Sequence, residues 1–204
     1  MQEKSVQGRA AYHHGDLRRV ILETAQAMLA EDQGWQFTLR EVARRAGVSH
    51  AAPYKHFPDR ASLLAELAMR GFDQLREVLG AAVAAHPRSV RKALLSAAVA
   101  YIQFGADHPA LYRLMFSAET SRIVGVHAGD RALNAMGVLL EVLQRGQREG
   151  VFRRKPAPGL AAACWSLVHG LTFLTIDGLL LPEKVGNAPV EAALATLLEG
   201  VEVP

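Results

Sequence analysis

The stretch from Thr38 to Phe57 concentrates side chains that could bind a phosphate backbone. Tyr54, Lys55 and His56 place a hydroxyl, an ammonium and an imidazole in consecutive positions. Contacts from such groups to phosphate oxygens set the register of a protein on nucleic acid and supply salt-dependent affinity, without reading sequence. We therefore expect these residues to hold a DNA backbone. For His56 the alternative is that the ring braces its helix against neighbouring helices.

A second group of residues in the same stretch could reach base edges. His50 could donate to a guanine or to a phosphate, and Ala51 and Ala52 are small enough to face the floor of a groove, where a methyl group can meet the thymine methyl. The alternative for His50 is a solvated histidine at a helix start. Ser49 either contacts DNA or only caps its helix.

Two short amphipathic helices, separated by residues 47–49, would have to position these side chains. Thr38 and Glu41 have the spacing of a capping box, and Gly47 would end the first helix. Thr38 could also offer its hydroxyl to a phosphate, and Arg44 could reach the backbone or simply be solvated. With Ser49 capping a third helix, the arrangement predicts a helix-turn-helix, which inserts its second helix into the DNA major groove.

Aromatic, histidine and methionine residues of the second half suggest a small-molecule site. An apolar pocket with a few polar anchors is how such sites are usually lined, although apolar residues at helical spacing are more often core. Trp165 and His169 lie one turn apart and share a helix face. The candidate ligand-binding residues are Tyr101, Phe104, His108, Tyr112, Met115, Phe116, Met136, Trp165, His169 and Phe173.

Signatures of enzymes and metal sites are not found in the sequence. There is no Gly-rich phosphate loop, no paired zinc-ligand spacing and no G-x-S-x-G. The single cysteine, Cys164, falls in an apolar helix, where a thiol is inert. We therefore expect no catalytic residue, no metal and no cofactor. A helical enzyme that uses Cys164 or a histidine is the alternative from that class.

The periodicity of the chain predicts an all-α protein of about nine helices. The first begins near Asp16, and the third begins at Ser49. The fourth begins at Asp59 and ends near Ala85, before His86-Pro87. Later helices are predicted at 90–107, 110–117, 131–149, 158–181 and 189–200. Strand alternation is absent throughout.

The composition of the chain bears on its binding partners and on its location in the cell. Half of the 204 residues are hydrophobic, and the formal net charge is only +3, so bulk charge does not argue for nucleic acid. One cysteine and no apolar leader fit a cytoplasmic location. The segment from Leu160 to Ile176 is uncharged and barely long enough to span a membrane, but His169 lies within it. We expect a buried helix there and no membrane association.

The pattern T-x-x-E-V-A-x-x-A-G-V-S, followed by Y-K-H-F and D-R-A-S-L-L, closely resembles the TetR family of bacterial transcriptional regulators. The resemblance covers residues 14–74, with the helix-turn-helix at 38–57. The run from Trp165 to Gly170 also resembles a W-x-x-x-H-G signature of one group of these regulators. One departure is Pro53, since family members usually have Leu or Ile before the tyrosine. A proline there loses a helical hydrogen bond and should stiffen or slightly bend the recognition helix.

The resemblance implies a DNA-binding domain at 14–74 and an effector-binding and dimerisation domain at 75–204. It implies a homodimer through helices 158–181 and 189–200, in which Gly170 and Gly178 would allow close packing. The expected function is a ligand-responsive repressor that binds a palindromic double-stranded operator and responds to a small apolar or amphipathic effector. Alternatives are an activator, a ligand-independent regulator, or a helical hydrophobe-binding protein that no longer binds DNA.

Overall fold

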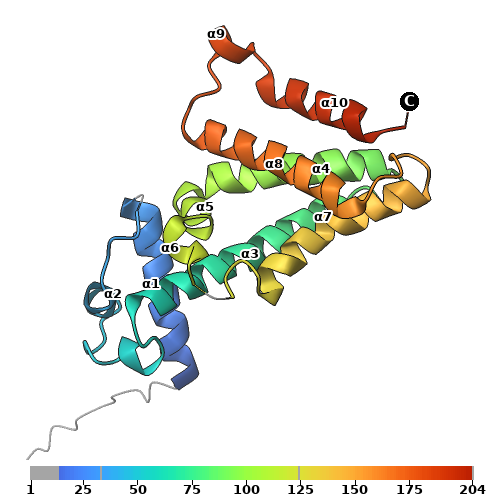
Figure 1. The fold of residues 1–204 in the computed structure, drawn as a ribbon. Helices are drawn as coiled ribbons and strands as arrows, with labels where there is room; N and C mark the ends of the chain where they lie inside the picture. Colours follow the sequence, from blue (N-terminus) through green and yellow to red (C-terminus); the bar gives the residue numbers. More distant parts are fainter. Residues whose placement is uncertain (1–13, 33, 124, 204) are drawn as a thin grey trace, which may run out of the picture. The chain divides into compact units, whose positions relative to one another are not determined.

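The computed structural model describes residues 14–32, 34–123 and 125–203 (Figure 1). Over these ranges the regular structure is helical, with eight α-helices of seven residues or more, two four-residue α-helices and one 3-10 helix. The single pairing of extended backbone in the same ranges is an isolated antiparallel bridge between Phe152 and Glu202. The prediction of an all-α protein with about nine helices is confirmed.

The helices follow one another along the chain with short connections. Their bounds are α1 His14–Asp32, α2 Leu39–Arg45, the 3-10 helix Pro53–Lys55, α3 Arg60–Ala84, α4 Val90–Asp107, α5 Pro109–Met115, α6 Ala118–Ser121, α7 Asp130–Arg148, α8 Ala157–Ile176, α9 Pro182–Val185 and α10 Pro189–Val201. They form two compact units, divided between residues 63 and 64.

The first unit has a small core between α1 and α2. Ile21, Leu22 and Ala25 of α1 are completely buried, as are Val42 and Ala43 of α2. The spacing of the α1 residues puts them on one helical face, as an amphipathic helix requires. After α2, Gly47 adopts a φ of +67°, a left-handed conformation that favours glycine and ends the helix as predicted.

The segment after that turn differs from the prediction of a third α-helix beginning at Ser49. Residues 50–52 form turns, and regular structure is limited to the 3-10 helix Pro53–Lys55. The Ala52 N–H donates to the carbonyl oxygen of Ser49, three residues earlier, at 2.9 Å. The His56 N–H likewise donates to the carbonyl oxygen of Pro53 at 2.9 Å. Proline has no N–H to donate to Ser49, so the α-helical bond at this point cannot form.

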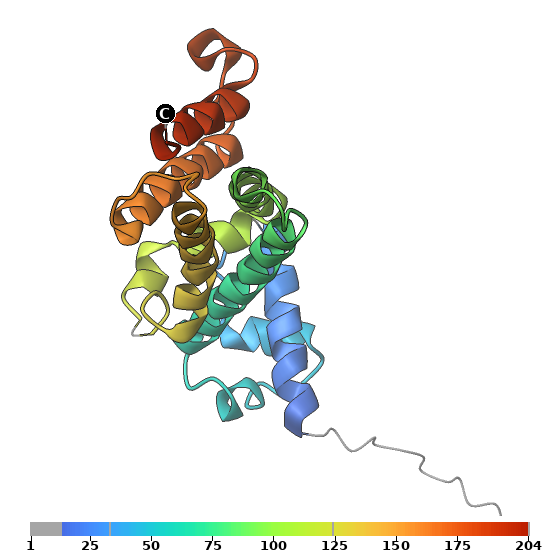
Figure 2. The same cartoon turned by 90° about the vertical axis from the view of Figure 1, so that its right-hand side faces the viewer.

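The second unit is a helical bundle in which α4 packs against α8 and α7, and α10 packs against α8 (Figure 2). The core includes Leu94 of α4, Leu143 of α7 and Phe152, none more than 3 % exposed. Close approach is possible at Gly146, because a Cβ there would lie 2.0 Å from the Phe152 ring. The end of the chain is held to the same cluster by the Arg153 N–H, which donates to the Val201 carbonyl oxygen at 2.8 Å.

The helix predicted at 158–181 ends earlier than its sequence pattern indicated. α8 spans Ala157–Ile176, and Gly178 follows it with a φ of +65°. The Gly178 N–H donates to the Thr175 carbonyl oxygen and the Leu179 N–H to Leu174, which is the bonding of a helix C-terminus. Gly178 therefore ends the helix and does not serve as a packing residue within it. Pro182 begins α9 instead.

Gly105→Ala should destabilise the second unit. A Cβ at Gly105 would lie 2.1 Å from Thr172 Cγ2, and the Thr172 side chain is fixed because its hydroxyl donates to the Val168 carbonyl oxygen at 2.6 Å. Overpacking of this kind costs about 1–3 kcal/mol. Thermal unfolding followed by circular dichroism measures the loss.

The matched control for this substitution is Gly80→Ala in α3. A Cβ at Gly80 meets nothing within 4 Å, so alanine should be neutral or raise stability by up to about 1 kcal/mol through its higher helix propensity. Equal midpoints for both variants would contradict the close packing of α4 against α8.

Candidate nucleic-acid interface and candidate ligand cavity

Most of the residues expected to contact DNA are available at the surface of the first unit. Tyr54 is 49 % exposed, although large apolar rings are usually buried. The exposed residues among the candidates are Thr38, Arg44, Ser49, His50, Ala51, Tyr54 and Lys55. All but Thr38 and Arg44 lie on the turns and the 3-10 helix between α2 and α3.

Two candidates are less accessible than expected. Ala52 is only 8 % exposed and packs in the core, so the expectation that it faces a groove floor is wrong for this conformation. Pro53, which follows Ala52 and begins the 3-10 helix, is buried as well. His56 is half-buried, and its Nε2 has no hydrogen-bond partner among the described residues. This placement agrees with the bracing alternative as much as with a phosphate contact.

A complete capping box positions α2. The Thr38 hydroxyl accepts from the Glu41 N–H at 3.2 Å, while Glu41 Oε2 accepts from the Thr38 N–H at 2.6 Å and from its hydroxyl at 2.8 Å. The bond from the Thr38 N–H, followed by the one from its hydroxyl, lowers the pKa of Glu41. Because the Thr38 hydroxyl proton is already donated to Glu41, a phosphate contact from this group would have to replace that bond.

The loop ahead of α2 and the segment after the 3-10 helix are both tied to the unit's core. Arg60 Nε donates to the Phe37 carbonyl oxygen at 2.9 Å, and the same guanidinium donates to the Trp35 carbonyl oxygen. Phe57, which is 2 % exposed, lies 5.4 Å under the Arg18 guanidinium. These contacts anchor both ends of the recognition segment, residues 49–57, in which Tyr54 and Lys55 stay exposed.

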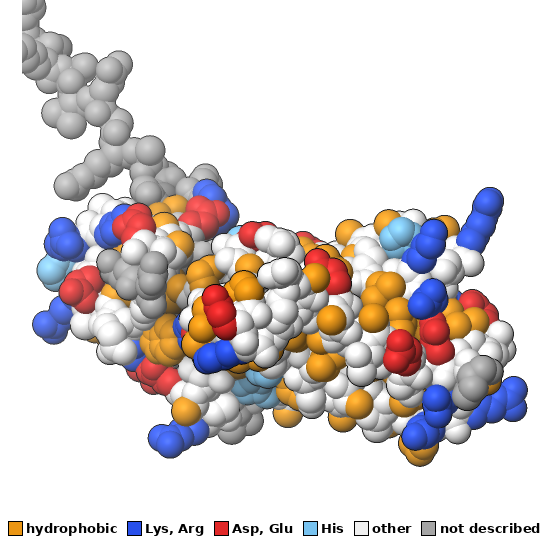
Figure 3. All heavy atoms as spheres, turned by 90° about the horizontal axis from the view of Figure 1, so that it is seen from above, with side chains coloured by type: hydrophobic (Ala, Val, Ile, Leu, Met, Phe, Trp, Pro, Cys, Tyr) orange, Lys and Arg blue, Asp and Glu red, His pale blue; other side chains and the backbone are white. Residues whose placement is uncertain are grey.

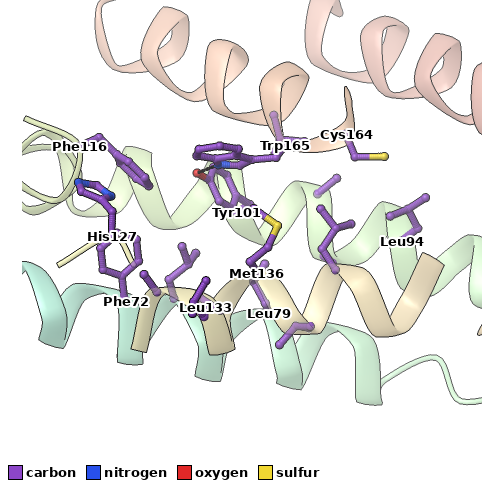
Figure 4. A pocket seen from close by; sticks show the side chains of 18 of the residues that line it. Phe72, Leu79, Leu94, Tyr101, Phe116, His127, Leu133, Met136, Cys164 and Trp165 are labelled. Atoms are coloured by element: carbon purple, nitrogen blue, oxygen red, sulfur yellow. Dashed lines mark hydrogen bonds between the residues drawn. The ribbon is translucent and has the colours of Figure 1, made fainter. Parts of the chain in front are cut away.

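The second unit contains a cavity of about 240 Å³ between α3 and α7 on one side and α4 and α8 on the other (Figure 4). Its walls are aliphatic and aromatic, including Leu79, Leu94, Leu133 and Val168, and no Asp, Glu, Lys or Arg lines it. Figure 4 shows Phe72, Phe116 and His127 at one end, Leu94 and Cys164 at the other, and Tyr101 and Trp165 between them. A concave, largely apolar site with few polar groups suits a small molecule.

Four of the ten expected ligand residues line this cavity, namely Tyr101, Phe116, Met136 and Trp165. The other six do not: Phe104, His108, Tyr112, Met115, His169 and Phe173. Tyr112 and Met115 are completely buried, and His108 is exposed. The helical pattern identified the apolar faces of these helices but could not separate the part facing the cavity from the part facing another helix.

Hydrogen bonds join Trp165, Tyr101, Tyr112 and His169 beside the cavity. Trp165 Nε1 donates to the Tyr101 hydroxyl oxygen at 3.1 Å, and the Tyr112 hydroxyl donates to the same oxygen at 3.0 Å. His169 Nδ1 lies 2.6 Å from the Tyr112 hydroxyl and 3.2 Å from that of Tyr101. Burial raises the pKa of Tyr101 to about 12, raises that of Tyr112 and lowers that of His169, so all three stay neutral at physiological pH.

Among the lining residues that the sequence analysis did not single out as ligand contacts are Phe72, His127 and Cys164. Of these, Cys164 was expected to lie in an apolar helix. Burial raises the pKa of the Cys164 thiol to about 11, which agrees with an inert thiol. His127 lies in the turns between α6 and α7, where no periodic pattern marks which side chains point inward.

A second hollow lies on the surface between α8 and α10. It is lined largely by small and apolar residues, among them Gly159, Ala163, Leu167, Leu197 and Gly200. A Cβ added at Gly159 or Gly200 would meet nothing within 4 Å, so the backbone is open here. Viewed from above in Figure 3, hydrophobic side chains and white surface atoms are interspersed over the exposed face of the molecule.

Among the residues that the structure describes, α8 is the one helix that is long and apolar enough to cross a membrane. Trp165 and His169 of this helix are hydrogen-bonded to Tyr101 of α4 and Tyr112 of α5. Within residues 14–32, 34–123 and 125–203, no three His, Cys, Asp or Glu side chains lie close enough together to hold a metal ion.

Two family models match the chain. The model described as "Tetracyclin repressor-like, C-terminal domain" matches residues 94–199, which is more than half of the chain. The model described as "Bacterial regulatory proteins, tetR family" matches residues 21–67, which include α2 and the recognition segment. A comparison with curated proteins found no match.

Solved structures share the fold over nearly the whole chain. A Rhodococcus sp. RHA1 protein of unknown function is 32 % identical, with a TM-score of 0.82 over 96 % of this chain and 100 % of that one. A bacterial regulatory protein in the tetR family from Rhodococcus RHA1 is 21 % identical, with a TM-score of 0.69 over 92 % and 98 %. A TetR family transcription regulator from Marinobacter aquaeolei VT8 is 19 % identical, with a TM-score of 0.68 over 92 % and 96 %.

Tyr101→Phe should destabilise the second unit. The substitution removes the oxygen that accepts from Trp165 Nε1 and from the Tyr112 hydroxyl, and a buried donor left without an acceptor costs about 1–3 kcal/mol. Urea unfolding followed by tryptophan fluorescence measures this loss. As the matched control, Tyr54→Phe removes an exposed hydroxyl and should change stability by less than about 0.5 kcal/mol. An unchanged midpoint for Tyr101→Phe would show that the shared oxygen is not needed.

Proposed function

Because this chain belongs to the TetR family of bacterial transcriptional regulators, which are non-enzymatic proteins that bind DNA operators and act as dimers, we propose that it is a ligand-responsive repressor. The observation that carries this proposal is the presence, in one chain, of an exposed donor-rich segment between α2 and α3 and a charge-free cavity in a second unit. The first suits an operator, and the second suits an apolar effector.

In the proposed complex the recognition segment divides its contacts by chemistry. Tyr54 and Lys55 hold phosphates, because a hydroxyl and an ammonium at the exposed end of the segment supply donors and charge but no base-specific pattern. His50 and Ala51, both exposed on the preceding turn, reach base edges. Ser49 lies beside them at the same surface.

Three further residues complete the proposed interface. Arg44 is exposed in the last turn of α2 and can approach a phosphate. Thr38 contributes if a phosphate replaces Glu41 as the partner of its hydroxyl. His56 is half-buried and contributes if its imidazole can reach a phosphate.

We propose, as expected from the sequence, that residues 14–74 bind DNA. Residues 75–204 bind the effector and the partner subunit. The family is a soluble, DNA-binding one, and we propose a cytoplasmic location. We also propose membership of the group with a W-x-x-x-H-G motif, because Trp165 and His169 share the buried hydrogen-bond cluster.

The proposed switch is a shift between conformations. An effector in the cavity can release the operator only if it binds more tightly to the conformation that fits DNA poorly. A palindromic operator with half-sites about 34 Å apart is expected, since this is one duplex turn. Selection of bound fragments from genomic DNA by the purified protein would yield the operator. The proposal fails if no duplex is preferred at low salt, or if ligands that fill the cavity never change operator affinity.

The proposed homodimer forms through α8 and α10. The first support is the open groove between these helices, where Gly159, Ala163 and Gly200 have small or no side chains. The second is Leu174, which is exposed near the end of α8. Four helices from two copies could pack here around a two-fold axis, so that each copy presents the same patch to the other. Gly170 remains a candidate for close approach, since a Cβ there meets nothing within 4 Å.

Lys55→Ala should weaken binding to all duplexes alike and reduce the slope of log affinity against log salt by about one, because one phosphate contact is lost. Fluorescence anisotropy over a range of salt concentrations measures both quantities. Lys92→Ala removes the same charge from an exposed position in α4 and should leave the slope unchanged. A changed order of preferred sequences with Lys55→Ala would refute the assigned role.

Ala163→Arg should convert the dimer to a monomer, because a long cation would occupy the groove between α8 and α10 where the second copy is expected. Light scattering after size-exclusion chromatography measures the mass, and operator affinity should fall with it. Ala106→Arg, at an exposed site on α4 outside the groove, is the control and should stay dimeric. A dimeric Ala163→Arg variant would move the interface elsewhere.

A further inference from the structure

One end of the cavity is built of aromatic rings. Figure 4 shows Phe72, Phe116 and His127 there, with Trp165 between them and the far end. Phe116 is the centre of this aromatic group, because its ring centroid lies 5.5 Å from that of Phe72, 6.0 Å from that of His127 and 6.4 Å from that of Trp165. The planes of Phe72 and Phe116 meet at 87°, and those of Phe116 and Trp165 at 45°. Because the rings are not parallel, this end of the wall combines ring edges with ring faces.

The other end of the cavity is aliphatic. Leu94 and Cys164 lie there in Figure 4, and neither carries an aromatic ring. Leu133 also lines the cavity although it is 55 % exposed, so the cavity is open to solvent and does not fix the length of a ligand. The wall therefore selects the chemistry of the part of a ligand that lies inside, and a substituent is free to extend outward.

Hydrogen bonding has little part in this wall, which contains no Asp, Glu, Lys or Arg. Trp165 Nε1 donates to the Tyr101 hydroxyl oxygen at 3.1 Å, and Tyr101 is further bonded to Tyr112 at 3.0 Å. His127 Nε2 is buried, out of reach of a ligand in the cavity. A polar group on the ligand would lose its hydrogen bonds to water without gaining one from these side chains.

Resting on the proposed effector function of this cavity, we propose that the part of its ligand that lies inside is an uncharged benzene ring, bare or alkyl-substituted, held by ring contacts and not by hydrogen bonds. The ring lies against Phe116 at the aromatic end. Alkyl substituents follow the aliphatic wall toward Leu94 or extend into solvent. Alkylbenzenes and related uncharged arenes belong to this class.

The preference for an aromatic ring over a saturated one follows from the charge distribution of the wall. An aromatic ring has a negative face and a positive edge, so pairs of rings favour edge-to-face or offset contacts at centroid distances of about 4.5–7 Å. The neighbours of Phe116 already lie within that range. One such contact raises affinity about two- to tenfold beyond the effect of buried area. A saturated ring of the same carbon skeleton gains only from the buried area.

Binding of toluene and methylcyclohexane to the full chain tests this inference, because the two molecules share a carbon skeleton and differ in aromaticity. Headspace gas chromatography over protein solutions measures both affinities. The ratio of the toluene affinity to the methylcyclohexane affinity should exceed the ratio for their transfer from water to hexadecane by about two- to tenfold. A ratio equal to that of transfer, or no binding of either hydrocarbon, would overturn the inference.

Phe116→Leu should lower this ratio by about twofold or more, because leucine keeps most of the apolar volume and removes the central ring. Phe116→Tyr keeps the ring and should keep the ratio. Phe173→Leu makes the same replacement at a half-buried ring outside the cavity and should leave the ratio unchanged. If Phe116→Leu does not fold, Phe116→Met replaces it. A ratio that is unaffected at position 116, or that falls equally in Phe173→Leu, contradicts the assigned ring contacts.

A third probe, 4-methylphenol, tests the absence of hydrogen bonding. It adds one hydroxyl to toluene, and calorimetric titration of the full chain compares the two. Since no partner is assigned to the hydroxyl, the phenol should bind no more tightly than toluene. Tighter binding of the phenol would show that the wall does supply a hydrogen bond, and the ligand class would be wrong.

Operator binding separates this inference from the function on which it rests, because the aromatic preference is measured without DNA. If the unsubstituted chain prefers no duplex, the regulator proposal fails whatever the hydrocarbons do. If operator binding is normal and the two hydrocarbons bind in the ratio of their transfer to hexadecane, only the ligand class assigned here is wrong.

Discussion

Three helices of the second unit meet at one buried oxygen atom, the hydroxyl of Tyr101. It accepts a hydrogen bond from Trp165 of α8 and another from Tyr112 of α5, while Tyr101 itself belongs to α4. In a low-dielectric interior an unpaired indole or phenol would be costly, so each of these groups requires the others to stay in place. The positions of α4, α5 and α8, and with them the cavity wall, depend on this shared acceptor.

The same pairing explains why the cavity can be apolar although tyrosine, tryptophan and histidine surround it. Polar atoms that satisfy one another leave aromatic faces and aliphatic side chains to line the space. At the end formed by Phe72, Phe116 and His127, the His127 Nε2 is buried and has no hydrogen-bond partner among the described residues. The wall of the cavity therefore consists mainly of aliphatic and aromatic surface, with no Asp, Glu, Lys or Arg in it.

In the first unit the corresponding constraint is the proline in the recognition segment. Pro53 cannot donate to Ser49, so the chain takes turns and a 3-10 helix where family resemblance suggested an α-helix. One side of the segment, with Ala52 and Phe57, belongs to the core, and the other keeps His50, Tyr54 and Lys55 exposed. The hydrogen-bond donors stay exposed although the backbone is not α-helical, because buried residues anchor the segment at both ends.

Local chemistry in the sequence determined much of this protein. The Thr38–Glu41 capping box, the stop at Gly47 and the span of α4 were all predictable, because each depends on residues a few positions apart. The tertiary structure alone decided which apolar faces enclose a cavity. Tyr101 and Trp165 line it and Tyr112 does not, since that choice depends on how α3, α4, α7 and α8 approach one another. The tertiary structure also decided that His127 lines the cavity. This residue lies in the turns between α6 and α7, which have no helical pattern, and its ring is positioned by contacts with Phe72 and Phe116, which are distant in the sequence.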